Sequence, residues 1–329
     1  MRVELPLVDP IFSTYHFHGA GSAIISENSS IRNWYLNESV ILSCETDFLK
    51  NRNSPELNIV NCCIHENPCL DKYWINLRFM NAKDLNTFIR RILNQGYYAH
   101  LWGVDDYYLP GKTWYRERHF CHDLLIYGYD SDEKTYLVYA YNQNWVYTTF
   151  EIPIKDCNRA RASMIKQNIY GNMWVMKPNS EVIIFEPKTA INNIKQYLNN
   201  TCNNASAKTN EVYGIQVQNY LVKYMDKLID GSIAYEHMDR RIFRLIWEHK
   251  KVMQERLRKI EEELNLNHSC SVAYDSIVAV ADAARMLYAT HLIKRRDSLL
   301  PIIQSKLESI MEQEEKILSN FVKHTERKL

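Results

Sequence analysis

The sequence predicts an α+β domain followed by an α-helical bundle, and two patterns support this division. Up to about residue 187, short segments rich in Val, Ile, Tyr and Trp alternate with Gly, Asp, Asn and Pro, which is typical of strands and turns. Beyond residue 187, apolar residues recur every three or four positions with charged residues between them, which is typical of amphipathic helices. We therefore expect an α+β domain over 1–186 and a helical bundle over 187–329.

Six segments of the first half carry the strand pattern. They are 97–104, 122–130, 134–142, 145–152, 173–177 and 182–187. The turn in "GYDSDEKTY" predicts a hairpin between the second and the third of them. We expect an antiparallel sheet that includes 97–105, 123–129 and 135–142.

Two helices are predicted before these strands. One begins within a few residues of Ala20, where a run of small residues leads into an apolar segment. The other covers 81–96, with Leu85, Ile89 and Ile92 on one face and Gly96 at the position of a C-terminal cap.

The second half contains three long amphipathic segments: 238–264, 271–294 and a segment that starts near Pro301. Proline is tolerated in the first turn of a helix, because its missing N–H would have no partner there. We expect the stripes on 238–264 and 300–324 to pack against each other. An amphipathic stripe does not identify what covers it, so a homodimer remains open.

Composition limits the classes of function. The chain has 329 residues, 46% of them hydrophobic, and a formal net charge of +1, so charge provides no general attraction to nucleic acid or to an anionic membrane. No run approaches the ~20 apolar residues of a membrane span, and the opening "MRVELPLVDP" lacks the apolar core of a signal peptide. We expect a cytoplasmic protein that binds neither nucleic acid nor membrane.

Eight cysteines are present, and none of them forms a C-x2-C pair. Cys62, Cys63, His65 and Cys69 form the one local cluster. We interpret these residues as reduced thiols, since the spacing typical of zinc sites is missing. We therefore predict no metal and no cofactor.

One histidine is placed like a catalytic base. His122 directly precedes an apolar strand, and the following strand ends close to Asn142 and Asn144. A histidine beside an amide on a neighbouring strand forms the base and its orienting group in a nucleophilic site. His119, three residues away, is an alternative.

Short blocks of the sequence resemble the butirosin biosynthesis protein H family over roughly residues 15–160. These blocks are "HGAGSAII", "LNESVILSCETDFL", "GVDDYYLP" and "HDLLIYGYD". The resemblance implies a papain-like cysteine-peptidase fold, related to the C39-like peptidases and used for acyl transfer. In that family a cysteine at the N-terminus of a helix takes an acyl group from a carrier-protein thioester and passes it to an amine.

The resemblance places the family's cysteine at Ala20, so a methyl group stands where a thiol is expected. Three explanations remain open: a substituted cysteine, a naturally inactive relative, or a shifted register that places His16, His18 or Gly19 at the site. His122 matches the catalytic histidine. The family's aspartate in the next strand is absent, so Asn142 is the best substitute and Asn144 the second.

The resemblance also implies a substrate site and its partners. One of the pair Asp105 and Asp106 is expected to contact the substrate amine or to support a residue of the site, with a plain turn carboxylate as the alternative. Trp102 and Tyr107 are candidates to line an acyl channel. The implied partners are an acyl or peptidyl carrier protein with a phosphopantetheine-bound acyl group, and a small amine acceptor, in nonribosomal antibiotic biosynthesis. A thioesterase or peptidase of the same fold is the alternative, as is an inactive protein that binds the carrier.

Overall fold

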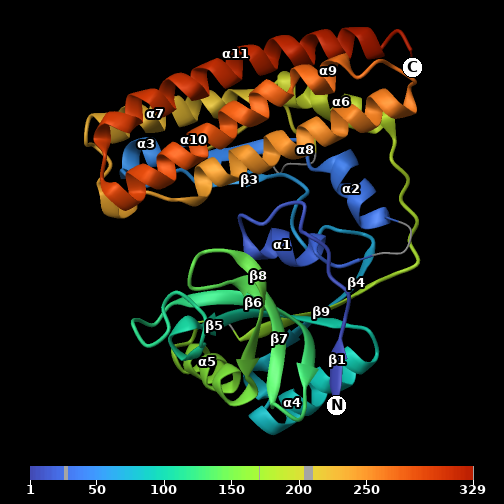
Figure 1. The fold of residues 1–329 in the computed structure, drawn as a ribbon, viewed down its shortest axis with the longest axis vertical. Coiled ribbons are helices and arrows are strands. Elements are labelled where there is room, and N and C mark those ends of the chain that lie inside the picture. The colour runs from blue at the N-terminus through green and yellow to red at the C-terminus, as the bar shows by residue number, and fades with distance from the viewer. Residues whose placement is uncertain (26–28, 170, 204–209, 329) are drawn as a thin grey trace. The chain divides into compact units, whose positions relative to one another are not determined.

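The computed structural model describes residues 1–25, 29–169, 171–203 and 210–328 (Figure 1). The chain divides into two compact units. Unit 1 contains residues 1–31 and 63–183, and unit 2 contains residues 32–62 and 184–329. The break at 183/184 lies close to the predicted boundary at 186/187. The segment 32–62 belongs to unit 2, however, so the first unit is not one continuous run.

Unit 1 is built on an antiparallel sheet with the strand order β4-β9-β5-β6-β7-β8, and β1 pairs with β6. Its strands are β1 (Arg2–Glu4), β4 (Leu70–Asn76), β5 (Tyr98–Asp105), β6 (Cys121–Asp130), β7 (Thr135–Tyr141), β8 (Tyr147–Pro153) and β9 (Asn172–Pro178). Its helices are α1 (His16–Ser22), α4 (Ala82–Asn94) and α5 (Ile154–Lys166), with short 3-10 turns η1 (Leu77–Phe79) and η2 (Asp106–Tyr108). The predicted antiparallel sheet and the β6–β7 hairpin are confirmed.

The two faces of this sheet carry different helices. Alternate residues of β7, such as Val138 and Ala140, pack in the core with apolar residues of α4 and α5. Tyr139 and Tyr141, which alternate with them, contact the ring of Tyr147, and Tyr141 and Tyr147 both contact α1. Helix α1 therefore lies on the sheet face opposite α4 and α5, as Figure 1 also shows.

Helix α4 confirms the prediction for 81–96. Asn81 caps its N-terminus by accepting from the N–H of Asp84, and Gly96 follows its C-terminus with a φ of +80°. That left-handed conformation favours glycine, because other residues place their Cβ against the backbone there.

The strand predicted at 182–187 is wrong. Residues 181–186 are not paired in a sheet, and Val182 and Ile184 are exposed by 66% and 64%. β-branched residues favour an extended backbone here, but a strand also needs a neighbour with which to pair. Both of these side chains remain available to solvent.

Unit 2 contains a small sheet, ordered β10-β2-β3, and a group of helices. Its strands are β2 (Leu42–Glu45), β3 (Leu57–Ile59) and β10 (Glu211–Tyr213). Its helices are α2 (Ser30–Glu38, which begins in unit 1), α3 (Phe48–Asn51), α6 (Pro187–Leu198), α7 (Val217–Ile229), α8 (Arg241–Glu263), α9 (Ser269–Ala273), α10 (Asp275–Lys294) and α11 (Leu300–Thr325). Short 3-10 turns are η3 (Gly214–Gln216), η4 (Tyr235–His237) and η5 (Asp297–Leu299).

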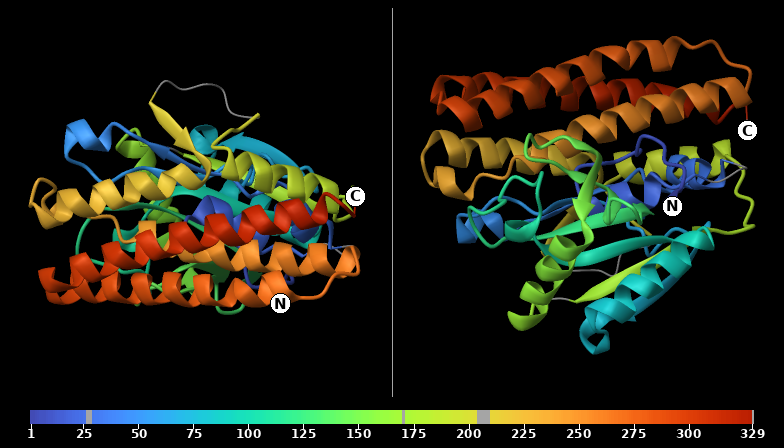
Figure 2. Two further views of the ribbon diagram at one scale, coloured as in Figure 1. Left: turned by 90° about the horizontal axis from the view of Figure 1, so that it is seen from above. Right: turned by 60° about the horizontal axis from the view of Figure 1, so that its bottom comes forward.

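The three long predicted helices are confirmed as α8, α10 and α11. Helix α10 packs between α8 and α11, which run alongside it (Figure 2).

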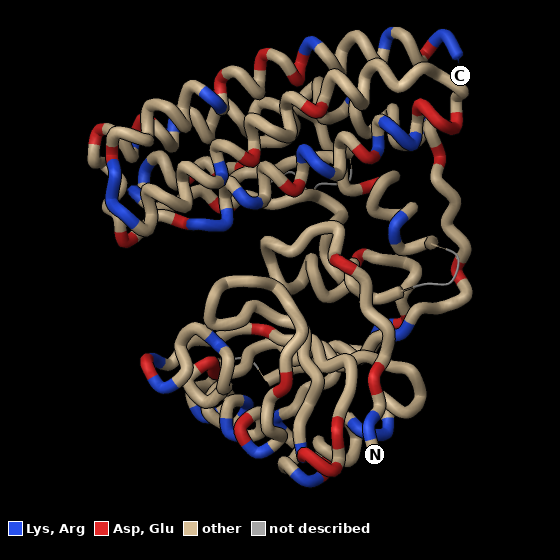
Figure 3. Tube along the Cα trace, viewed as in Figure 1, with Lys and Arg blue, Asp and Glu red and all other residues tan. Residues whose placement is uncertain are grey.

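Among the described residues, one segment, Ser269–Lys294, is long and apolar enough to cross a membrane by length and composition. About 28% of its most apolar stretch is buried within unit 2, and a single such helix is weak evidence for a membrane span. Charges of both signs are interspersed over each unit (Figure 3), in agreement with the net charge of +1.

A fully buried ion pair joins α8 to α11 in unit 2. Lys250 Nζ lies 2.6 Å from Glu314 Oε2, and both side chains are fully buried. Tyr197, Gln218 and Tyr274 also donate hydrogen bonds to this carboxylate. Buried charges are costly unless they are paired and hydrogen-bonded, and this arrangement provides both.

Replacing one member of this pair should destabilise unit 2 strongly. Lys250→Met leaves the Glu314 carboxylate buried without its cation, so the free energy of unfolding should fall by about 3–5 kcal/mol. The double variant Lys250→Met/Glu314→Gln should lose clearly less than the sum of the two single changes. Urea unfolding of the four proteins in the cycle measures this coupling.

The matched control is Lys259→Met, which removes an exposed ion pair with Glu263 and should cost less than ~0.5 kcal/mol. Additive single changes would contradict the coupling.

Candidate active site

A histidine and an aspartate meet at the end of the sheet in unit 1. Val104 of β5 pairs with His122 of β6, so η2, which follows β5, begins beside the histidine. His122 Nδ1 lies 3.0 Å from Asp106 Oδ2. This carboxylate is buried, while the His122 side chain is 22% exposed. A buried carboxylate fixes the orientation and tautomer of such an imidazole.

A buried lysine balances the charge of Asp106. Lys112 Nζ lies 3.4 Å from Asp106 Oδ1, and both side chains are 1% exposed. Burial lowers the pKa of Lys112, and the neighbouring Asp106 and Asp123 carboxyl groups oppose this shift. One carboxylate therefore faces a lysine on one oxygen and a histidine on the other.

Helix α1 brings a second histidine to His122. The helix begins at His16, and the ring centroids of His16 and His122 are 4.6 Å apart. Tyr147 packs edge-on against His16 with centroids 5.5 Å apart. Burial lowers the pKa of His16 well below its usual value, and nearby His122 and Lys112 lower it further, so this imidazole is neutral at pH 7. Within the described chain, neither ring nitrogen of His16 makes a hydrogen bond of good geometry, and a contact with the Asp123 backbone only partly opposes the lowering of its pKa.

The predicted nucleophile position, Ala20, lies in the second turn of α1 and is fully buried. We expected position 20 at the N-terminus of the helix, but that place belongs to His16. Next to Ala20, a Cβ at Gly19 would approach the Tyr147 ring to 2.9 Å, so this turn packs closely on β8. Of the alternative positions considered, His16 is the one whose ring contacts that of His122 at the helix start.

The predicted orienting residue, Asn142, has a different role. Its Oδ1 accepts from the backbone N–H groups of Asn144 and Val146, and this closes the turn between β7 and β8. The group on His122 Nδ1 is Asp106. The sequence placed Asp106 beside the site but did not identify it as the group that orients the histidine. The adjacent pair Asp105-Asp106 at the end of a predicted strand was the available signal.

Asp105 is a structural carboxylate, so the turn interpretation applies to it rather than a role with the substrate amine. It is fully buried and accepts from the N–H groups of Tyr107 and Phe120. Its Oδ2 lies 2.6 Å from both His119 Nδ1 and Ser163 Oγ. His119 is therefore engaged with Asp105 instead of competing with His122 as the base.

The two predicted channel aromatics lie in different surroundings. Trp102 stacks on Phe17 of α1, one residue from His16, with ring centroids 6.3 Å apart. Trp102 thus remains close to the start of α1. Tyr107 instead stacks on His119 at 4.5 Å and belongs to the cluster around Asp105.

Burial raises the pKa of six of the eight cysteines, so these six are not activated thiols. They are Cys44, Cys63, Cys69, Cys121, Cys157 and Cys270. Cys121 precedes His122 in β6, and consecutive strand residues point to opposite faces. Its pKa is raised to about 11, so its thiol is protonated at neutral pH.

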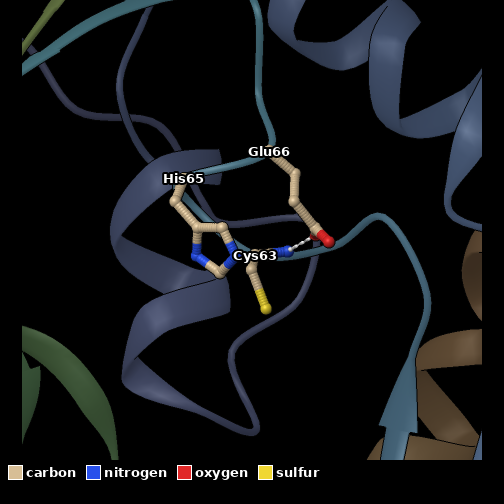
Figure 4. A group of neighbouring side chains, drawn as sticks. All are labelled: Cys63, His65 and Glu66. Atoms are coloured by element: carbon tan, nitrogen blue, oxygen red, sulfur yellow. Dashed lines mark hydrogen bonds between the residues drawn. The ribbon is translucent and has the colours of Figure 1, made fainter. Parts of the chain in front are cut away.

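Among the described residues, Cys63, His65 and Glu66 bring three potential metal-ligand atoms within 4.8 Å of one another (Figure 4). The backbone N–H of Cys63 donates to Glu66 Oε2 over 2.8 Å, which explains the position of Glu66 without an ion. Burial and the Glu66 charge raise the pKa of Cys63 to about 12. The absence of a metal stays a prediction, and the group supports no assignment by itself.

A cavity of about 390 Å³ lies in unit 2 and is lined by residues of α8, α9 and α11. Its carboxylate, Glu261, accepts from the N–H groups of Cys270 and Ser271 and so caps α9. Burial and Glu261 raise the pKa of Cys270 to about 12. The acid and the thiol in this cavity are thus in structural, unreactive states.

Asp123, next to His122 in β6, titrates near neutral pH. Burial raises its pKa from 3.8 to about 7, and the N–H of Gly103, which donates to Oδ1, opposes the shift. His100 Nε2 lies 3.8 Å from Asp123 Oδ2, and burial lowers the pKa of His100 to about 4, so this histidine is neutral and offers no positive charge.

Asp123 should make the stability of unit 1 depend on pH. The folded protein holds this proton up to about pH 7, whereas the unfolded chain releases it near pH 3.8, so stability falls as the pH rises between these values. Asp123→Asn removes the effect. We expect the difference between the unfolding free energies of Asp123→Asn and the parent to shift in favour of the variant as the pH rises. Between pH 4 and pH 7 this shift should reach up to about 4 kcal/mol. Urea unfolding across this range measures it, with Glu133→Gln in the exposed β6–β7 turn as control. Parallel curves for Asp123→Asn and the parent would contradict the assignment.

Comparison with known proteins adds no relative: no family model matches this chain, and no curated protein matches it.

Proposed function

We propose that unit 1 is a papain-like acyl-transfer domain in which His122 acts as a general base. The observation that carries this proposal is the 3.0 Å contact between His122 Nδ1 and the buried Asp106, beside the start of α1. A helix start facing a histidine that is oriented by a carboxylate is the arrangement of nucleophilic acyl-transfer sites. The proposed reaction forms an amide from an acyl thioester and an amine.

The proposed chemistry needs no thiol on the protein. The amine nitrogen attacks the thioester carbonyl carbon while His122 Nε2 takes the amine proton. The carbon–sulfur bond then breaks, and the leaving thiolate accepts the proton from His122. Asp106 is a positioning residue, which holds Nδ1–H and stabilises the imidazolium that forms.

His16 suits this direct reaction better than an acyl-enzyme. Its imidazole stands at the helix start where a thiol would be expected, and its pKa is strongly lowered by burial. A neutral ring adds no positive charge next to His122, so the basicity of His122 is preserved. A cationic ring at 4.6 Å would instead oppose protonation of His122.

The proposed substrate is an acyl group on the phosphopantetheine of an acyl or peptidyl carrier protein, and the acceptor is a small amine. This assignment rests on the resemblance of the short sequence blocks to the butirosin biosynthesis protein H family. It places the protein in nonribosomal biosynthesis in the cytoplasm. Transfer to water would make the same site a thioesterase.

A second candidate is an inactive protein that binds the same carrier. The observation favouring it is that position 16 carries a histidine and that the nearby Cys121 is not activated. Binding without turnover separates it from the first proposal.

Loss of the base should abolish turnover while binding persists. His122→Ala should lower kcat/KM for aminolysis of a synthetic acyl-pantetheine thioester by roughly 10²–10⁴-fold. Asp106→Asn should lower kcat with little change in KM, because it disturbs the tautomer of His122 and not the substrate site. Asn142→Ala, which alters the β7–β8 turn, is the control and should stay within about threefold. A parent protein that binds acylated carrier protein but never exceeds the background rate would favour the inactive-binder candidate.

A thiol installed at the start of α1 should restore covalent chemistry. His16→Cys should form an acyl adduct with the same thioester, seen by intact mass, because His122 can accept the thiol proton there. Ala20→Cys lies a turn further along α1 and should remain unmodified. In His16→Cys/His122→Ala the adduct should form at least tenfold more slowly. Adduct formation at position 20 but not at 16 would restore the original assignment to Ala20.

A further inference from the structure

Helix α10 presents an uncharged face to solvent. The face has exposed or half-exposed side chains spaced by alternating steps of four and three residues. Its members on α10 are Ser276, Ala279, Ala283, Met286, Thr290 and Ile293, and Val272 of the preceding α9 continues the spacing. Val272, Met286 and Ile293 are exposed by 60%, 53% and 80%. This spacing is the heptad pattern of a helix that packs along a second helix.

The remaining surface of α10 is already used within unit 2. Tyr274 in the preceding turn, and Ile277, Ala281, Ala284 and Tyr288 in α10, are buried, and α10 packs against α8 and α11. The exposed face is thus additional to the face that holds the helix in the bundle. Val280 and Leu287 flank the exposed face, and because both are apolar and half-buried they make the apolar surface wider.

We propose that this face pairs with the same face of a second copy of the chain, with the two α10 helices antiparallel. In an antiparallel pair, residues of the two heptad seams face each other across a twofold axis. A register centred between Ala284 and Arg285 places Ala283 opposite Met286 of the second copy. The same register places Ala279 opposite Thr290 and Ser276 opposite Ile293, so small residues receive large ones along the whole face.

The charges at the two ends of α10 select this direction. Asp275 is exposed at the N-terminal end, while Lys294, Arg295 and Arg296 are exposed at the C-terminal end. In the antiparallel register Asp275 lies opposite Lys294 of the second copy, and the twofold axis repeats this pair. A parallel pair would set acid against acid and base against base, which is unfavourable.

The size of the face determines how tight the dimer is. Helix α10 has 20 residues. At about 1.5 Å per residue and a width of about 10 Å, the strip covers roughly 300 Å² on each copy. This is well below the ~800 Å² per partner of a standard interface, so the dimer is weak and reversible.

Sedimentation over a range of protein concentrations tests the proposal. The mass of the parent chain should rise with concentration from 39.0 kDa towards twice that value. Met286→Glu should remain monomeric, because it places a charge at the centre of the apolar seam. Ile229→Glu, at a 44% exposed apolar site on α7, is the matched control and should dimerise like the parent. Circular dichroism checks that each variant is folded. A parent that stays monomeric at all concentrations overturns the proposal.

Two further variants test the register. Ala283→Cys/Met286→Cys should form a disulfide-linked dimer on mild oxidation, whereas Ser305→Cys/Glu308→Cys, on the exposed side of α11, should not. Asp275→Lys should weaken the dimer, and adding Lys294→Asp should restore it. A dimer that is insensitive to Met286→Glu and to the charge exchange would overturn the assigned face. Binding to phosphatidylserine vesicles that Met286→Glu abolishes, without dimerisation, would show a membrane surface instead.

Discussion

The buried carboxylate of Asp106 is the group on which the arrangement of unit 1 depends. It sits directly after β5 and serves two partners, with Lys112 on one oxygen and His122 on the other. Removing a carboxylate or a lysine from water costs several kcal/mol, and the cost is offset when the two remain paired. Loss of Asp106 would leave Lys112 buried and unpaired, and would also free the ring of His122. The fold and the orientation of the candidate base are thus linked through one side chain.

The charges around Asp106 compensate one another. Lys112 faces the carboxylate, while His16 and His100 are neutral because burial lowers the pKa of each. Asp123, with a pKa raised to about 7, is the nearby group that changes charge near neutrality. Lys112 thus offsets the charge of Asp106, and neither buried imidazole adds a second positive charge. A second positive ring beside His122 would upset that balance and weaken its ability to accept a proton.

Sequence periodicity predicted the helices and most of the sheet because these signals are local. The stripes of α4, α8 and α11, and the β6–β7 hairpin, each lie within one continuous stretch. The strand expected at 182–187 failed because β propensity describes a backbone shape and cannot supply a pairing partner. The position of 32–62 in unit 2 was not predictable either, since it depends on contacts with residues far along the chain.

The site was predicted only in part, because its residues come from separate segments of the sequence. His122 was identified at a strand end, but its partner was sought in β7, its neighbour in sequence. β6 also pairs with β5, and Asp106 comes from that side. This strand order, β5-β6-β7, fixes the site and cannot be read from any single segment. The place of the helix start was likewise off by one turn, because the small-residue run sets the helix without marking its first residue.

The two buried lysine–carboxylate pairs of the chain differ in a way that separates structure from chemistry. In unit 2, the Glu314 carboxylate is held by Lys250, Tyr197, Gln218 and Tyr274, so little of its hydrogen-bonding capacity remains. Around Asp106, by contrast, both ring nitrogens of His16 and the hydroxyl of Tyr147 are buried and make no hydrogen bond of good geometry in the described part of the chain. Unmet polar groups are costly, and proteins retain them mainly where a ligand or a reaction uses them. The first network also contains one such atom, Gln218 Oε1, but its carboxylate is fully engaged, whereas the second has several such atoms around a positioned histidine. That difference supports the proposal that the chemistry lies in unit 1.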